Sequence, residues 1–370
     1  LSIGEPKHPA PSFVTKALTA ALDKLSAYPL TKGIPELRQA IAEWLTRRFQ
    51  LQSVDSESQV LPVNGTREAL FSFAQAVVDR TTQPLVLSPN PFYQIYEGAA
   101  LLAGATPEFL NCLEPNHFSP DFDAVSPEVW QQCQLIYLCS PGNPTGAVLD
   151  LSTLKKLIHL ADQYDFIIAS DECYSEIYGD ESNPPPGLLQ ACAEMERHDY
   201  HRCVVFHSLS KRSNLPGLRS GLVAGDAEVL KSFLRYRTYH GCAMPVPTQL
   251  ASISAWEDEI HVKENRDKYR KKFEIFQQVL GDVLPITLPD AGFYLWADTL
   301  PANKGSDEDF AQKLFAEQNI TVLPGQYLAR TVDGINPGEN RVRMALVASE
   351  EDCREAAERI KQFVTGKARV

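Results

Sequence analysis

Apolar residues recur along the chain with two different periods, one typical of helices and one typical of strands. Spacings of three and four residues predict helices at 14–25, 37–45, 67–78, 93–103 and 151–164. Short runs that are almost wholly apolar predict strands at 60–63, 85–87, 135–139, 166–169 and 204–206. Strands that are apolar on both faces are typical of a parallel sheet covered by helices on each side. Residues 50–250 are therefore predicted to form an α/β region.

The pattern changes after Pro247. Residues 260–280 are highly charged and predict an exposed helix that joins two bodies. The remaining segments predict strands at 293–297, 320–323 and 342–347, and helices at 307–318 and 350–364. The predicted fold class is α/β, with a three-layer αβα large domain on a mostly parallel sheet and a smaller α+β domain. We expect the large domain at 30–250 and a discontinuous small domain formed by 1–29 and 251–370.

Composition narrows the classes of partner. The 370 residues include 35 lysines and arginines against 47 aspartates and glutamates, which gives a formal net charge of −12. An acidic chain repels nucleic acid and anionic lipid as a whole, so neither is an expected partner. An anionic substrate would therefore require a local basic pocket.

Cysteine usage and missing motifs exclude further classes. The eight cysteines include no C-x-x-C pair, which favours reduced thiols in a cytoplasmic enzyme. No apolar run reaches the roughly 18 residues of a membrane span, and residues 1–10, with Glu5, Lys7 and two prolines, do not resemble a signal peptide. The usual dinucleotide, P-loop, zinc-protease and serine-hydrolase motifs are absent, and no metal site is predicted.

The first candidate motif follows the predicted strand at 204–206. It contains Ser208, Ser210 and Lys211, with Arg219 eight residues later. A lone lysine after a strand is often only surface charge, but serines, a lysine and an arginine together suit an anion. A lysine whose pKa is lowered by nearby cations can form a Schiff base with an aldehyde.

Asp171 and Tyr174 follow the neighbouring predicted strand. A carboxylate in this position is often only a helix cap. Buried, it can instead keep a pyridine nitrogen protonated and so make the ring an electron sink. Tyr174 could donate a hydrogen bond to a phenolate oxygen of such a ring.

Three more loops join predicted strands to helices. The first, 140–146, is rigid with proline and glycine and presents the amide of Asn143. The second, 64–67, leads into a helix whose free N–H groups can bind phosphate. The third presents Tyr93, which is either a core aromatic or a surface that stacks on a flat ring. In open α/β sheets, ligands bind at such strand ends.

Taken together and in this order, the motifs resemble those of the fold-type-I pyridoxal 5′-phosphate (PLP) aminotransferases of class I and II. The resemblance extends from Gly4 to Arg343. It implies that Lys211 forms the Schiff base and moves protons, that Asp171 binds the ring nitrogen, and that Asn143 and Tyr174 bind the ring oxygen. It further implies cofactor contacts for Tyr93 (stacking) and for a phosphate site formed by Gly65, Thr66, Arg67, Ser208 and Arg219.

The resemblance also implies substrate contacts and a partner. Arg343 would grip the substrate α-carboxylate in bidentate geometry, with Arg341 as the competing candidate on the opposite face of the strand. Gly4, Asn143 and Arg330 complete the implied substrate site. Tyr28 resembles a tyrosine that reaches the phosphate of a neighbouring subunit, so a homodimer with shared sites is expected.

The identity of the substrate is the most specific of these expectations. Residues 237–244 and 322–330 resemble the succinyldiaminopimelate aminotransferase branch, which implies transfer from glutamate to N-succinyl-2-amino-6-oxopimelate. The extra carboxylates would need cationic or polar groups, with Arg330, Lys32, Arg237 and His240 as candidates. A broader alanine, aspartate or aromatic aminotransferase, or a PLP-dependent C–S lyase, remains the alternative. A DNA-binding regulator is disfavoured because no basic module is present, and a catalytically inactive binding module is disfavoured because Lys211 is retained.

Overall fold

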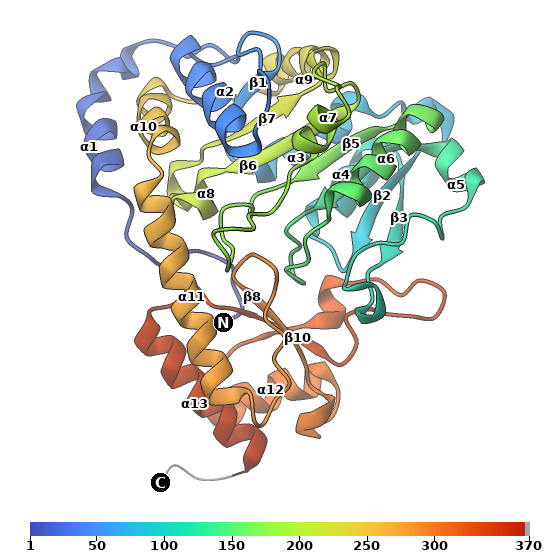
Figure 1. The fold of residues 1–370 in the computed structure, drawn as a ribbon, viewed down its shortest axis with the longest axis vertical. Coiled ribbons are helices and arrows are strands. Elements are labelled where there is room, and N and C mark those ends of the chain that lie inside the picture. Colours follow the sequence, from blue (N-terminus) through green and yellow to red (C-terminus); the bar gives the residue numbers. More distant parts are fainter. Residues whose placement is uncertain (367–370) are drawn as a thin grey trace.

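The structure is a computed structural model in which residues 1–366 are described, and it contains two sheets (Figure 1). The larger sheet has the order β1-β7-β6-β5-β4-β2-β3, and the smaller has the order β8-β10-β9. The strands are β1 (Val60–Val63), β2 (Leu85–Asn90), β3 (Thr106–Asn111), β4 (Cys133–Cys139), β5 (Ile167–Asp171), β6 (Cys203–Ser208), β7 (Gly221–Gly225), β8 (Tyr294–Asp298), β9 (Leu323–Pro324) and β10 (Arg341–Ala345). In the larger sheet β3, β2, β4, β5 and β6 are parallel, whereas β7 is antiparallel to both of its neighbours. The predicted fold class is confirmed.

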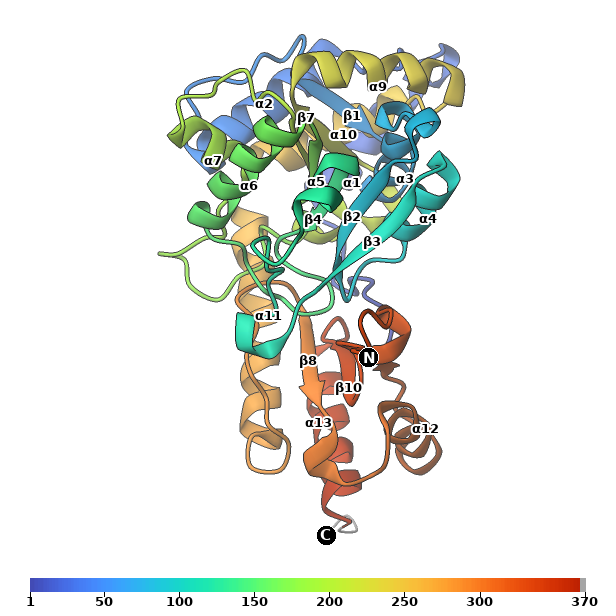
Figure 2. The ribbon, with the colours of Figure 1, turned by 90° about the vertical axis from the view of Figure 1, so that its right-hand side faces the viewer.

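Helices cover both faces of the larger sheet (Figures 1 and 2). The α-helices are α1 (Ser12–Ala20), α2 (Pro35–Phe49), α3 (Thr66–Val77), α4 (Ile95–Ala103), α5 (Pro127–Gln132), α6 (Leu151–Tyr164), α7 (Leu188–Glu194), α8 (Leu209–Arg212), α9 (Ala227–His240), α10 (Val246–Glu257), α11 (Ile260–Leu280), α12 (Asp307–Gln318) and α13 (Glu350–Thr365). Local chemistry explains several starts, because Pro35 begins α2 and the side chains of Asp150 and Ser349 cap α6 and α13. Within residues 1–366, no helix has the length and apolarity needed to cross a membrane.

Neighbouring residues of the central strands enter two separate cores. Leu138 of β4 packs in the cluster that contains Trp44 and Trp256, whereas Tyr137 packs in the cluster that contains Phe73. Successive side chains of a strand point to opposite faces, so both faces of the sheet are apolar. This arrangement explains why the strands read as continuous apolar runs and confirms that prediction.

The long helix α11 runs from the larger body into the smaller one, where it packs beside α13 (Figure 1). Its bounds match the predicted helix, but the expectation that it is exposed is wrong for one face. Lys272 is fully buried and contacts His8, and Arg266 is buried in an ion pair with Glu181. Charged side chains can be buried when each one has a polar partner, and the sequence alone does not reveal such partners.

The N-terminal residues lie between the two bodies. The carbonyl of Leu1 accepts a hydrogen bond from the backbone N–H of Ala345, the last residue of β10. Helix α1 packs instead against α10 on the larger body. The expected domain division at residues 29/30 and 250/251 stays a prediction.

Two strands were not predicted and one was overestimated. β3 is half-exposed at the sheet edge and contains Pro107 and Glu108, so its pattern is weak. β7 is short and begins and ends with glycine. The strand predicted at 320–323 is limited to Leu323–Pro324, and a 3-10 helix follows it directly.

Candidate active site

The site begins where three parallel strands end side by side. Cys139 at the end of β4 is paired with Asp171 at the end of β5, and Asp171 is paired with Phe206 of β6. The strand ends therefore bring the Asn143 loop, Asp171 and the Ser208–Lys211 turn to one edge of the sheet. This is the edge at which open α/β sheets bind ligands.

Lys211 lies in the short helix α8, and its amine is withdrawn from water. Nζ donates a hydrogen bond of 2.5 Å to the carbonyl oxygen of Gly4 and lies 5.4 Å from the ring centre of Phe293. The pKa of Lys211 is lowered to about 8, chiefly because burial penalises the ammonium form, with a smaller contribution from the charge of Arg343. The lowered pKa was predicted, but Arg219 was expected to cause it, whereas burial is the main cause.

Asp171 is buried and accepts two hydrogen bonds. Its Oδ2 accepts from the hydroxyl of Tyr96 at 2.8 Å, and its Oδ1 accepts from the backbone N–H of Cys173 at 3.3 Å. Burial raises the pKa of Asp171, while both hydrogen bonds oppose that rise because they favour the ionised form. Tyr174 lies nearby, with its hydroxyl 3.0 Å from the hydroxyl of Tyr294.

A cradle for an anion lies at the start of α3. Gly65 has a left-handed φ of +87°, and a side chain there would clash with the guanidinium of Arg219. No side chain caps this helix, so its first-turn N–H groups are available to an anion. Thr66 contributes a hydroxyl 3.1 Å from the Cys173 sulfur, and the Ser208 hydroxyl accepts from the N–H of Ser210. The cradle thus brings together segments from β1–α3, β6–α8 and the turn before β7.

Arg343 projects from β10 of the smaller sheet toward the same region. Its Nη1 donates to the side-chain oxygen of Asn143 at 2.9 Å, and its Nη2 donates to the carbonyl of Ser2 at 2.7 Å. The guanidinium lies 4.5 Å from the ring centre of Tyr294. Its buried Nε has no hydrogen-bond partner among residues 1–366, so this arginine retains a donor.

A family model described as aminotransferase class I and II matches residues 1–360. The chain belongs to this family. Aminotransferases of this class depend on PLP, so the expected cofactor is confirmed. The fold comparison agrees: an aminotransferase from Neisseria meningitidis has a TM-score of 0.93 and 55% identity, covering 97% of this chain and 90% of its own. Aminotransferase AspB from Helicobacter pylori has a TM-score of 0.90 and 34% identity, covering 99% of this chain and 93% of its own.

Curated relatives carry a more specific name. LL-diaminopimelate aminotransferase of Aquifex aeolicus is 34% identical over 367 residues, which is 98% of this chain and 90% of that protein. The enzyme of the same name from Maridesulfovibrio salexigens is 32% identical with the same coverage.

Several predicted residues of this aminotransferase lie in other surroundings. Tyr28 is fully exposed. Arg330 forms a bidentate ion pair with Glu97, and Lys32 pairs with Glu57. The charges of these two cations are therefore already neutralised, and the substrate role of Arg330 stays a prediction.

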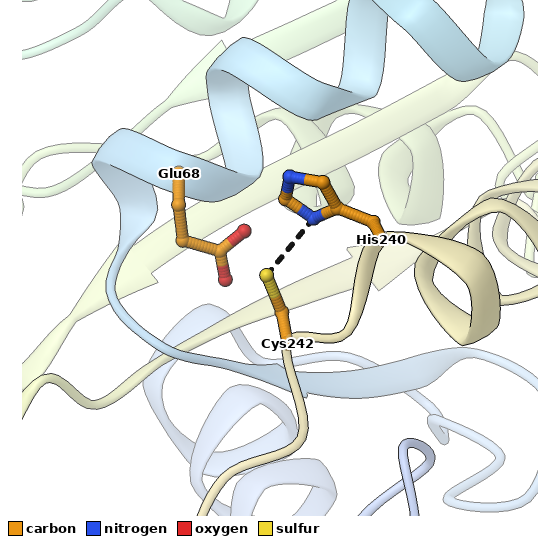
Figure 3. A group of neighbouring side chains, drawn as sticks. All are labelled: Glu68, His240 and Cys242. Carbon is orange, nitrogen blue, oxygen red and sulfur yellow. Dashed lines mark hydrogen bonds between the residues drawn. The ribbon is translucent and has the colours of Figure 1, made fainter.

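Arg237 and His240 belong to a separate cluster. The ligand atoms of Glu68, His240 and Cys242 lie within 4.8 Å of one another (Figure 3), a set that could bind a metal ion. Glu68, however, accepts two hydrogen bonds, at 2.8 and 3.0 Å, from the buried guanidinium of Arg237. That positive charge disfavours a second cation. Glu68 also accepts from the N–H of Asn64, so we assign the pair to support of the anion cradle.

Three contributors to the site were missed by sequence reasoning. Tyr96 and Tyr294 lie within apolar stretches and have the pattern of core residues. The carbonyl of Ser2 was missed because a backbone atom leaves no signal in a sequence. Only the spacing of Tyr96, three residues after Tyr93 at a helix start, could have suggested that the two tyrosines share a face.

Proposed function

We propose that this aminotransferase acts in diaminopimelate biosynthesis and moves an amino group between glutamate and N-succinyl-2-amino-6-oxopimelate. The observation that carries the amino-transfer part of the proposal is that Lys211 and Arg343 converge on one short segment. Lys211 binds the carbonyl of Gly4, and Arg343 binds the carbonyl of Ser2. Two residues of extended chain span at most about 7 Å. A deprotonatable amine and a carboxylate-binding guanidinium thus lie within the reach of one amino acid.

The residues fit PLP in charge and shape. When bound, this cofactor supplies an electron sink for charge that develops at the substrate Cα. Lys211 would hold it covalently and Asp171 would face its ring nitrogen, with Tyr93 against the ring and Asn143 and Tyr174 near the ring oxygen. The phosphate would lie in the cradle formed by Gly65, Thr66, Arg67, Ser208 and Arg219. The fit rests on the cradle, where only glycine at position 65 leaves room for the Arg219 guanidinium.

Lys211 is suited to move the proton of the substrate. With a pKa of about 8, about a tenth of the amine is neutral at pH 7. The neutral Nζ can take the proton from the substrate Cα and return it to another carbon. An ordinary lysine near pKa 10.4 would be neutral in fewer than about one molecule in a thousand.

Arg343, rather than Arg341, is proposed to bind the α-carboxylate. Arg341 instead pairs with Glu114. The expectation that Arg341 lies on the opposite face of β10 is wrong, because residues two apart on a regular strand share a face; its ion pair is what distinguishes it from Arg343. The guanidinium of Arg343 is oriented by Asn143 and Tyr294, and its Nη2 donates to the carbonyl of Ser2 in the N-terminal segment. A planar fork suits the two oxygens of a carboxylate.

The backbone N–H of Arg67 is the part proposed for the phosphate cradle, and its side chain is the cation proposed to bind a second carboxylate of the substrate. Its Nε donates to the hydroxyl of Tyr93 at 2.8 Å, and it forms no ion pair with a carboxylate of residues 1–366. A succinylated substrate carries additional carboxylates and no free distal ammonium, so an unpaired arginine supports it. The names of the curated relatives support unsubstituted LL-diaminopimelate as a second candidate.

The partner is proposed to be a second copy of the chain. Tyr28 is fully exposed, and the apolar side chains of Leu22, Leu25 and Leu30 around it are each at least half-exposed. Exposed apolar residues that gather in one segment mark interaction sites. In this proposal, Tyr28 reaches the phosphate of the neighbouring subunit.

The test uses purified holoenzyme with 2-oxoglutarate as amino acceptor and two alternative donors. We expect kcat/KM for N-succinyl-LL-diaminopimelate to exceed that for LL-diaminopimelate at least tenfold. Arg67→Gln should remove this preference, whereas Arg47→Gln, at an exposed position on α2, should keep it. A preference for LL-diaminopimelate, or conversion of alanine, aspartate or aromatic amino acids only, would overturn the succinyl substrate.

A further inference from the structure

Tyr96 forms a hydrogen bond with Asp171, and its ring packs against two other tyrosines. Its side chain is 1% exposed, and its hydroxyl donates to Asp171 Oδ2 at 2.8 Å. Its ring stacks on Tyr137 with centroids 4.8 Å apart and planes inclined by 13°, and it meets Tyr93 edge-on at 5.8 Å. The hydroxyl therefore has little freedom to leave the carboxylate.

The hydrogen bonds of Asp171 leave acceptor positions open for a further donor. A carboxylate offers about four acceptor positions, and two are taken by the Tyr96 hydroxyl and the Cys173 N–H. Both donors belong to the protein, so the remaining acceptor positions are available to the ring nitrogen of the cofactor. The two donors fix the plane of the carboxylate and favour its negative charge in a buried setting that otherwise opposes charge.

We propose that Tyr96 is a positioning residue that keeps Asp171 ionised and directed at the ring nitrogen of PLP. The proposal rests on the role proposed above for Asp171. Residues 93–96 would then act on the cofactor in two ways. Tyr93 would stack on the face of the ring, and Tyr96 would hold Asp171, which binds the ring nitrogen. An ionised Asp171 holds a proton on that nitrogen, which is the state in which the ring withdraws electrons best.

Tyr137 offers a matched control. It is also a fully buried tyrosine in the same stack, but its hydroxyl donates to the backbone carbonyl of Leu70. Tyr137→Phe removes a buried hydroxyl and its hydrogen bond without touching Asp171. Tyr96→Phe removes the one that faces the carboxylate and keeps the ring that stacks on Tyr137.

Two measurements test the proposal, and neither is enzyme activity. Equilibrium dialysis gives the Kd for PLP, and NMR of holoenzyme loaded with ¹⁵N-labelled PLP follows protonation of the ring nitrogen with pH. We expect Tyr96→Phe to raise Kd about tenfold and to lower the pKa of the ring nitrogen by about one unit, the size expected for one hydrogen bond to a charged group. Tyr137→Phe should leave the nitrogen titration unchanged.

The outcomes distinguish failure of the role of Tyr96 from failure of the role proposed for Asp171. If Tyr96→Phe leaves the nitrogen titration unchanged while Asp171→Asn alters it, Tyr96 has no positioning role. If both tyrosine variants shift the titration equally, the effect is one of packing and the proposal is also wrong. If Asp171→Asn itself has no effect on the nitrogen, the role of Asp171 fails first. Circular dichroism of each variant confirms that it is folded before these comparisons.

Discussion

Replacing Arg343 by lysine tests the substrate site through a change that keeps the positive charge. The guanidinium donates to Asn143 and to Ser2 and retains a third donor at Nε. Lysine carries a compact ammonium that cannot form two parallel hydrogen bonds with a carboxylate. One charge-assisted hydrogen bond to the substrate would therefore be lost.

The size of the effect follows from that single bond. A hydrogen bond to a charged group contributes about 1.5–3 kcal/mol, and each 1.36 kcal/mol is about tenfold in rate. We expect kcat/KM for glutamate to fall about 10- to 150-fold in Arg343→Lys. The assay is the half-reaction of holoenzyme with glutamate, followed at substoichiometric to saturating concentrations.

Arg341→Lys is the matched control because it lies two residues away on the same strand. Arg341 pairs with Glu114 rather than with Asn143 and Ser2, so kcat/KM should change less than twofold. Equal losses in the two variants would refute the assignment of the α-carboxylate to Arg343. An unchanged Arg343→Lys would refute it as well.

Three further predictions concern the amine, the N-terminal segment and the cradle. In cofactor-free protein, the acylation of Lys211, measured by peptide mass spectrometry, should rise about tenfold from pH 7 to pH 9. The reason is that a pKa of about 8 makes the neutral amine dominant by pH 9. Labelling that becomes half-maximal only near pH 10 would contradict a pKa lowered by burial. Gly4→Ala should lower kcat/KM at least about tenfold, since the added Cβ clashes with the Tyr294 hydroxyl, whereas Gly179→Ala, with open space around it, should be neutral in the same assay. Glu68→Gln should lower the free energy of unfolding, measured in urea, by about 3 kcal/mol, because it leaves the buried charge of Arg237 without its partner. The control is Glu228→Gln, which removes an exposed ion pair with Lys231 and should change the free energy of unfolding by less than about 0.5 kcal/mol. Equal effects of the two substitutions would refute the argument.

The sequence allowed prediction of the parts that rest on local pattern. Helices 151–164, 260–280 and 307–318 and the strand at 60–63 have the predicted bounds, because the pattern of each segment differs clearly from that of its neighbours. The strand ends that carry Asp171 and Lys211 could be placed at one sheet edge by the rules of parallel α/β folds. These are features in which one segment is sufficient for the inference.

Features that depend on distant partners could not be predicted. Nothing local to Arg237 reveals that Glu68 neutralises it, and nothing local to Arg330 reveals Glu97. The buried Lys272 of α11 reads as a surface charge until His8 is seen beside it. Tyr96 has the pattern of a core aromatic for the same reason, because Asp171, the partner of its hydroxyl, lies 75 residues away.

The central claim is that Lys211 is the residue that holds PLP covalently, and its most direct test is a peptide map. Holoenzyme is treated with borohydride, which reduces a carbon–nitrogen double bond to a stable single bond, and digested for mass spectrometry. We predict that the pyridoxyl phosphate mass is found on the peptide that contains Lys211 and is lost in Lys211→Ala. A label on another lysine of the wild-type enzyme, or a map without label, would contradict the account.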